Sequence, residues 1–532
     1  MTSTNRPALA LVARNHPQCN LGAFANAAVT ARPQSRAVID LSQPKPAWLS
    51  YAQVEDCIKQ CVSYVGSLGI GRGDRVGMAA PNSLGFIVAQ LALMRRGAVP
   101  VLINPRLPID TIRYMIGDAD MTHIVADLDD APGLQSLAIL PGLRCLFAVG
   151  DPPAGWSRWA PLDHAERSDE VAVMGFDDQA FQAYTAGSTG LPKGIVLTHG
   201  GMLWGIEHNQ LYWPANAEQR GIVAAPMFHK NAMRGTIKPM MYVGGSFVIQ
   251  RRFNPASYLA ALSDHEVTFC GGVPAMFAEI LKLGPDPARL KHLKVISMGS
   301  STVPKELVAR LKEALPHVYV KESYGLTEGG GPLRADIGGR PTPPGSVGVP
   351  APEYELRLAA ARQEDGATIG ELEIRSPYVA REYYKRPDLN EARLSDGWLK
   401  TGDVFKVDAQ GFHYFVGRSD DMFVCGGENI YPKDVEAVLM THHAVTDAIV
   451  VPLPHETKGF APAAVVARRL ETDVTPGEIQ DHCAENGPSY AIPRAVIVLD
   501  QLPVTAAGKP DRKAAKEMLE AEAGLLKRRI TT

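Results

Sequence analysis

The segment from Arg75 to Ile103, RVGMAAPNSLGFIVAQLALMRRGAVPVLI, has the pattern that decides the fold class. It begins with a short apolar stretch, residues 75–80, that a Pro-Asn pair closes, as is typical of a buried strand. Residues 84–96 are apolar enough for a buried helix, and residues 98–103 have the composition of a second buried strand. A strand, a helix and a strand in this order predict a parallel sheet with helices on its faces.

The same alternation occurs on both sides of this segment. Before it, residues 52–68 have apolar groups at helical spacing, and Gly69 suits the end of that helix. After it, the pattern predicts strands at 267–269, 294–298 and 318–320 and helices at 275–283 and 304–315. We therefore expect an α/β fold with parallel or mixed sheets in a large N-terminal domain.

The character of the sequence changes after about residue 340. A Pro/Gly-rich loop at 341–352 is followed by alternating stretches that predict strands at 371–374, 404–407 and 412–416. The last two are joined by a hairpin-type loop at 408–411, and Pro432 marks the start of a helix at 433–440. We expect a β-rich lobe at about 341–418 within an N-terminal domain at 1–418, and a smaller, mobile α+β domain at 419–532.

Composition excludes several classes of protein. The 532 residues, 45% of them hydrophobic and 21% charged, indicate at least two globular domains. With 54 basic and 57 acidic residues, the net charge of -3 gives no reason to expect nucleic acid or an anionic membrane as a partner. No apolar run is long enough to span a bilayer, and the first residues lack the pattern of a secretory signal. Seven scattered cysteines without a C-x-x-C pair favour a reducing compartment, the cytoplasm.

The segment from Tyr184 to Gly194, YTAGSTGLPKG, is the strongest local motif. Glycines let backbone N–H groups approach an anion closely, and serine and threonine hydroxyls add donors. This composition indicates a phosphate-binding loop, although the spacing differs from that of a Walker A loop. The alternative interpretation is a flexible Gly/Ser linker.

Five further motifs follow in the chain. They are YGLTE at 324–328, TGD at 401–403, GRSDD at 417–421, GGENIYP at 426–432 and LPVTAAGKPDR at 502–512. Taken alone, each is also compatible with an ordinary turn, linker or exposed side chain. A carboxylate such as Glu328 beside a phosphate site would be repulsive without a cation, which favours Mg²⁺ at this point.

Together the six motifs resemble, in kind and order, the signatures of the AMP-forming adenylating enzymes. This superfamily includes acyl-CoA synthetases, peptide-synthetase adenylation domains and luciferases, and the motifs here are most similar to those of aryl- and acyl-CoA ligases. The resemblance covers the chain from about residue 25 to 515. It implies ATP, Mg²⁺ and coenzyme A as cofactors.

The resemblance assigns roles to individual residues. It implies Lys509, Thr327, Glu328 and His229 as catalytic residues, with Glu328 also holding the metal. The ATP and AMP site is expected to contain Thr185, Ser188, Thr189, Gly190, Lys193, Ser300, Ser301, Glu322, Ser323, Tyr324, Gly325, Asp403 and Arg418. Asp420 matches the hinge about which the C-terminal domain rotates in the family.

The thiol and acyl sites are implied in the same way. Coenzyme A is expected at Gly426, Gly427, Tyr490 and Arg494, and the acyl group at His208, His229, Lys230, Asn231 and Gly299. Residues 225–237 lack the aspartate with which amino-acid-activating domains bind an amino group. The polar run from His229 to Arg234 favours a small, aromatic or hydroxylated acid over a long alkyl chain.

The implied activity is that of an ATP-dependent carboxylic acid–CoA ligase that works through an acyl-adenylate. Alternatives within the family are an adenylating enzyme that loads a carrier protein, a medium- or long-chain fatty acid–CoA ligase and a luciferase-type oxidase. From another class, a non-catalytic ligand-binding relative is also considered. A homodimer is an expectation at the family level only.

Overall fold

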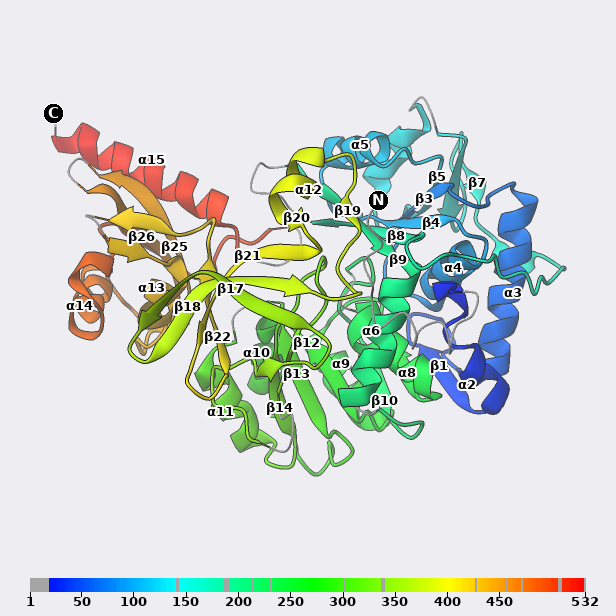
Figure 1. The fold of residues 1–532 in the computed structure, drawn as a ribbon, viewed down its shortest axis with the longest axis horizontal. Helices are drawn as coiled ribbons and strands as arrows, with labels where there is room; N and C mark the ends of the chain where they lie inside the picture. The colour runs from blue at the N-terminus through cyan, green and yellow to red at the C-terminus, as the bar shows by residue number, and fades with distance from the viewer. Residues whose placement is uncertain are drawn as a thin grey trace. The chain divides into compact units, whose positions relative to one another are not determined.

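The structure is a computed structural model, and it describes residues 19–139, 143–185, 191–212, 215–229, 232–300, 303–335, 340–425, 428–455, 458–469, 472–505 and 510–530. The chain forms two compact units (Figure 1). Unit 1 comprises residues 1–356 and 374–400, and unit 2 comprises residues 357–373 and 401–532. The fold is α/β, as the sequence predicts.

An eight-stranded mixed sheet in unit 1 contains the segment that the sequence singles out. Its order is β19-β9-β8-β4-β3-β5-β6-β7. The strands are β3 (Arg75–Ala79), β4 (Val99–Leu102), β5 (His123–Asp127), β6 (Cys145–Val149), β7 (Ser157–Arg158), β8 (Gln179–Thr185), β9 (Lys193–Thr198) and β19 (Glu382–Tyr383). β3 and β4 are parallel and joined by α4 (Leu84–Arg95), whose first turn Ser83 caps at the Phe86 N–H, so the predicted strand–helix–strand unit is confirmed.

A second sheet of unit 1 has seven strands in the order β14-β13-β12-β10-β11-β1-β2. They are β1 (Arg36–Asp40), β2 (Trp48–Ser50), β10 (Arg220–Val223), β11 (Ser246–Ile249), β12 (Phe269–Gly272), β13 (Val295–Gly299) and β14 (Tyr319–Ser323). The helices α9 (Pro255–Asp264), α10 (Pro274–Lys282) and α11 (Lys305–Ala314) alternate with them along the chain, and their buried apolar side chains share one core with the sheet. Parallel pairing brings the carboxyl ends of β13 and β14 to one edge.

One predicted strand lies differently. Residues 267–269 were expected to form it, but β12 begins only at Phe269. The Val267 N–H donates to the Leu262 carbonyl of α9 and so completes the end of that helix. The Thr268 N–H already donates to the Arg220 carbonyl at the start of β10, so only Val267 of the predicted strand belongs to the end of the helix.

The remaining elements of unit 1 are mostly short helices. α3 (Tyr51–Ser67) begins with a capping box between Ser50 and Gln53 and confirms the helix predicted at 52–68. The others are η1 (Leu21–Ala23), α2 (Asn26–Ala31), α5 (Ile109–Asp118), η2 (Pro132–Ile139), η3 (Pro161–Asp163), α6 (His199–Tyr212), the π-helical turn η4 (Met233–Ile237), α8 (Lys238–Val243) and α12 (Pro387–Arg393), with the short strands β15 (Leu333–Arg334) and β16 (Val349–Pro350).

The segment after residue 350 is rich in strands, as predicted. One sheet contains β17 (Glu355–Glu364), β18 (Ala367–Arg375), β20 (Leu394–Ser395), β21 (Trp398–Val407) and β22 (His413–Arg418). The division into units runs through β17, β18 and β21, because unit 2 takes residues 357–373 and 401 onward. The domain boundary predicted at Arg418 stays a prediction.

The rest of unit 2 is an α+β fold. Its sheet, in the order β24-β23-β26-β25 with β27 on β26, contains β23 (Phe423–Cys425), β24 (Glu428–Ile430), β25 (Val445–His455), β26 (Gly459–Arg468) and β27 (Val496–Leu499). The helices are α13 (Pro432–Leu439), α14 (Pro476–Asn486), η6 (Ser489–Ala491) and α15 (Arg512–Ile530). In Figure 1, α15 lies along β25 and β26, where Ala515 and Leu519 are buried. Among the described residues, we find no helix with the length and apolarity needed to cross a bilayer.

Candidate active site

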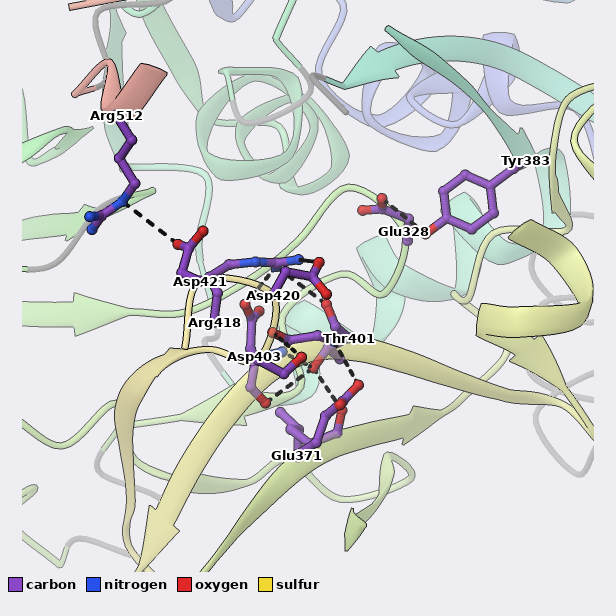
Figure 2. A network of polar contacts seen from close by, with 12 residues as sticks. Glu328, Glu371, Tyr383, Thr401, Asp403, Arg418, Asp420, Asp421 and Arg512 are labelled. Carbon is purple, nitrogen blue, oxygen red and sulfur yellow. Dashed lines mark hydrogen bonds and ion pairs between the residues drawn. The ribbon is translucent and has the colours of Figure 1, made fainter. Parts of the chain in front are cut away.

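Glu328 lies in a tight loop that follows β14. Leu326 and Gly330 exchange two backbone hydrogen bonds of 2.9 and 3.0 Å, which close the loop. The Tyr383 hydroxyl donates to Glu328 Oε1 at 3.3 Å, as Figure 2 shows, and the Ala380 N–H donates to the Glu328 carbonyl at 2.7 Å. Both the backbone and the carboxylate of Glu328 are therefore held in place.

The chemistry of this loop fits a hard cation. Mg²⁺ prefers oxygen ligands, and it is usually bound by one or two carboxylates together with substrate phosphates and water. Among the described residues there is no cluster of three or more His, Cys, Asp or Glu side chains suited to a metal. A magnesium ion at Glu328 would therefore take its other ligands from nucleotide phosphates and water.

The ends of β13 and β14 place the predicted adenine-side residues together. A Cβ on Gly299 would collide with the Ser323 hydroxyl and carbonyl oxygens, so this position requires glycine. The Ser323 hydroxyl donates to the Met298 carbonyl at 3.0 Å. Burial raises the pKa of the Glu322 carboxyl, which accepts the Gly345 N–H at 3.2 Å.

The predicted phosphate-binding loop connects two antiparallel strands. Thr185 at the end of β8 lies opposite Lys193 at the start of β9. The structure thus brings the first and last polar residues of the motif together at one end of a hairpin. Ser188, Thr189 and Gly190 lie outside the described residues, as do Ser301, Lys230 and Asn231.

Unit 2 holds a charged pair formed by Asp403 and Arg418. They face each other across the β21–β22 pairing, and Arg418 Nη1 donates to Asp403 Oδ1 at 2.7 Å (Figure 2). Burial acts to lower the pKa of Arg418, but the carboxylates of Asp403 and Asp420 outweigh it and raise the pKa. The guanidinium is therefore charged throughout the physiological range.

Hydrogen bonds around the pair fix its backbone. The Asp403 N–H donates to Thr401 Oγ1 at 3.0 Å, and the Thr401 hydroxyl donates to the Leu372 carbonyl at 2.7 Å. The Gly402 N–H donates to Glu371 Oε1 at 3.0 Å. The predicted hinge residue Asp420 lies 3.3 Å from Arg418 Nη2, in the turn after β22.

The two histidines predicted for the acyl site have different surroundings. His208 is buried and stacks on Trp204 at 4.5 Å, and its Nε2 lies 2.6 Å from the Pro352 carbonyl oxygen. Burial lowers the pKa of His208 to about 4, so the ring is neutral and Nε2 donates to that carbonyl. His229 is only partly buried, and its backbone N–H donates to the Pro226 carbonyl at 3.1 Å.

Of the residues predicted for coenzyme A, Tyr490 lines a small cavity of about 130 Å³ in unit 2. Tyr431, Asp434 and Cys483 also line it, and burial raises the pKa of Asp434 to about 6. The Arg494 N–H donates to the Pro462 carbonyl at 2.8 Å. Gly426, Gly427 and Lys509 lie outside the described residues.

The contact between Tyr383 and Glu328 has no signal in the sequence. The two residues are 55 positions apart, and Tyr383 belongs to the two-residue edge strand β19. A strand of this length has no detectable periodicity, so no local signal could have revealed the contact.

Comparison with known proteins shows the family. The AMP-binding enzyme family model matches residues 25–384, and the AMP-binding enzyme C-terminal domain model matches residues 434–509. The chain therefore belongs to the AMP-binding enzyme family. The predictions of an AMP-forming adenylating enzyme and of an acid–thiol ligase are confirmed.

Three relatives illustrate the similarity. A feruloyl-CoA synthase from an Amycolatopsis species is 31% identical over 87% of this chain and 92% of its own length. The long-chain-fatty-acid–CoA ligase FadD13 of Mycobacterium tuberculosis is 28% identical over 94% of this chain and 99% of its own. The crystal structure of the anthranilate CoA ligase AuaEII in complex with anthranoyl-AMP has a TM-score of 0.85 at 24% identity, covering 95% of this chain and 98% of that one, and it shows the shared fold.

Proposed function

We propose that the protein is an ATP-dependent carboxylic acid–CoA ligase that forms an acyl-adenylate and acts on a small, aromatic or hydroxylated acid. The observation that carries this proposal is similarity to acid–CoA ligases over nearly the whole chain, including the C-terminal model that ends at Lys509. The relatives named above act on feruloyl, fatty acyl and anthranoyl groups. Polar residues between His229 and Arg234 favour the smaller, more polar acids.

In the first half-reaction, a carboxylate attacks the α-phosphorus of ATP and releases pyrophosphate. Both reactants are anions, so catalysis depends on positive charge and alignment. We assign the phosphates to Thr185, Lys193, Thr327 and the loop between the first two, and Lys509 to the reacting groups. Bound at Glu328, Mg²⁺ would neutralise phosphate charge.

The ribose is assigned to Asp403. A carboxylate held by Arg418 and by a fixed backbone can accept hydrogen bonds from neighbouring hydroxyls without reorganising. Ser300, Glu322, Ser323, Tyr324 and Gly325 are assigned to the adenine side. In the second half-reaction a thiol attacks the acyl carbonyl, and we assign Gly426, Gly427, Tyr490 and Arg494 to coenzyme A.

A panel of carboxylic acids with ATP, Mg²⁺ and coenzyme A tests the proposal, with pyrophosphate and thioester measured separately. We expect one class of acid to give both products. Lys509→Ala should abolish acyl-adenylate formation yet spare thioester formation from supplied acyl-adenylate. Pyrophosphate without thioester would instead indicate a carrier protein as acceptor, and no pyrophosphate with any acid would contradict the ligase assignment.

A cytoplasmic location and a homodimer are further proposals. Six cysteines of the described residues are free thiols, which supports a reducing compartment. Fractionation of cells and light scattering of the purified protein test the two proposals.

A further inference from the structure

Two arginines of unit 1 lie beside the loop that carries Glu328. Arg234 belongs to the π-helical turn η4, a type of turn that is frequent at functional sites. Its Nη1 lies 2.8 Å from the point where a Cβ on Gly325 would be, and its Nη2 contacts the corresponding point on Gly331. The absence of side chains at these glycines therefore makes room for the guanidinium.

Arg334 is the second arginine and belongs to the short strand β15. Its Nε is inaccessible to solvent and has no hydrogen-bond partner. Burial, and to a smaller extent the positive charge of Arg234, lower the pKa of Arg334 to about 10. The two guanidinium groups are thus close enough to repel each other.

The described side chains around the pair do not neutralise its charge. The two arginines act on the pKa of Tyr354, Tyr378 and His208, and all three of these side chains are buried and uncharged at neutral pH. Within the described parts of the chain, neither guanidinium makes an ion pair with a carboxylate. Two crowded positive charges without a counter-ion are costly, and a bound anion would offset this cost.

We propose that Arg234 and Arg334 bind a second carboxylate on the acid substrate, so that the enzyme activates one end of a dicarboxylic acid. This inference rests on the ligase function proposed above. The planar guanidinium fork matches a carboxylate in two parallel hydrogen bonds. The aromatic side chains of Tyr354 and Tyr378, which lie beside Gly330, suit the carbon skeleton that joins the two carboxylates.

Polyphosphate is the competing ligand, because the Glu328 loop is also assigned to ATP. The neighbouring side chains of Tyr354 and Tyr378 argue against polyphosphate, since buried aromatic rings offer little to a highly hydrated triphosphate. The experiment below separates the two ligands.

The test compares acids that differ by one carboxylate, benzoate with isophthalate and butyrate with glutarate, by pyrophosphate release in the presence of ATP and Mg²⁺. We expect the diacid of at least one pair to have a kcat/KM higher by ~10-fold or more. Arg334→Met should lower kcat/KM for that diacid on the order of 100-fold and change the value for the monoacid little. Arg334→Lys should recover part of the loss, and the exposed Arg310→Met serves as a matched control.

A melting experiment supports the kinetics without requiring turnover. Removal of one of two like charges should raise the melting temperature of ligand-free Arg334→Met, whereas the diacid should raise it only in the parent protein. The inference would be overturned if monoacids had the higher kcat/KM, or if Arg334→Met lowered kcat/KM equally for both acids and for ATP. Either result would leave the ligase function intact. No pyrophosphate with any acid would instead overturn both.

Discussion

At the scale of single residues, the Asp403–Arg418 pair offers a direct test of the nucleotide site. Asp403→Ala removes the proposed ribose acceptor and leaves the Arg418 guanidinium without its 2.7 Å partner. Loss of hydrogen bonds from the ribose to a charged acceptor is expected to cost about 1.5–3 kcal/mol, so pyrophosphate release should fall by roughly 10- to 100-fold. Asp500→Ala is the matched control, because Asp500 pairs with Arg468 at the same 2.7 Å on an exposed surface; an equal loss in the control would contradict the assignment.

The motifs of the sequence predict a set of side chains for the site, and this set stays a prediction; they do not indicate how those side chains are held. The sequence predicts a phosphate-binding loop at this motif, but not the antiparallel strands that place Thr185 opposite Lys193. Contacts such as Tyr383 with Glu328, or Arg234 with Gly331, join residues far apart in the chain. Only the tertiary pairing of short elements creates them, so no local pattern could predict them.

At the scale of elements, helices and strands with clear periodicity were predicted within a residue or two, as α3, α4, β3 and β4 show. Their partners were not predictable in the same way. The sequence predicted parallel or mixed sheets, but it did not indicate that β8 and β9 would pair antiparallel or that the distant β19 would join them at the edge. The period of a strand sets which face is buried, whereas long-range packing selects its neighbour.

The helix α8 contains a buried lysine, Lys238. We expect this residue to make the stability of the protein depend on pH. Burial lowers the pKa of Lys238 to about 7, and its amine lies 5.2 Å from the Phe181 ring. The unfolded chain therefore binds one more proton than the folded chain between pH 7 and about 10.5, so stability should rise with pH over this range.

Lys238→Met removes the cost of burying this amine in its charged form, and it should raise the free energy of unfolding at pH 7 by about 3 kcal/mol. The advantage over the parent protein should shrink steadily towards pH 10, because the lysine then loses its proton in the unfolded chain too. Urea unfolding at several pH values measures the difference, with Lys312→Met on the exposed face of α11 as control. A difference that does not depend on pH would show that the amine is charged when folded.

At the scale of the whole molecule, composition and length predicted more than one domain, but not a unit built from two separate stretches. Unit 2 takes residues 357–373 as well as everything from 401 onward. Such a division follows from strand pairing, which brings β18 to β21 across more than twenty residues of intervening chain. A change in composition along the chain indicates a change in the type of secondary structure, but it does not indicate which strands pair or share a core.

The predicted hinge at Asp420 allows the two half-reactions to be tested separately. If the family's hinge operates here, adenylation needs one backbone conformation at this residue and thioester formation needs another. Asp420→Pro fixes φ near −65°, so pyrophosphate release should stay within about 3-fold of the parent value while thioester output falls by ~10-fold or more. Asp420→Ala also removes the 3.3 Å contact with Arg418 but leaves φ free, so it should retain both activities. Parallel loss of both products in Asp420→Pro, or loss of thioester in Asp420→Ala, would show that the side chain and not the backbone rotation matters.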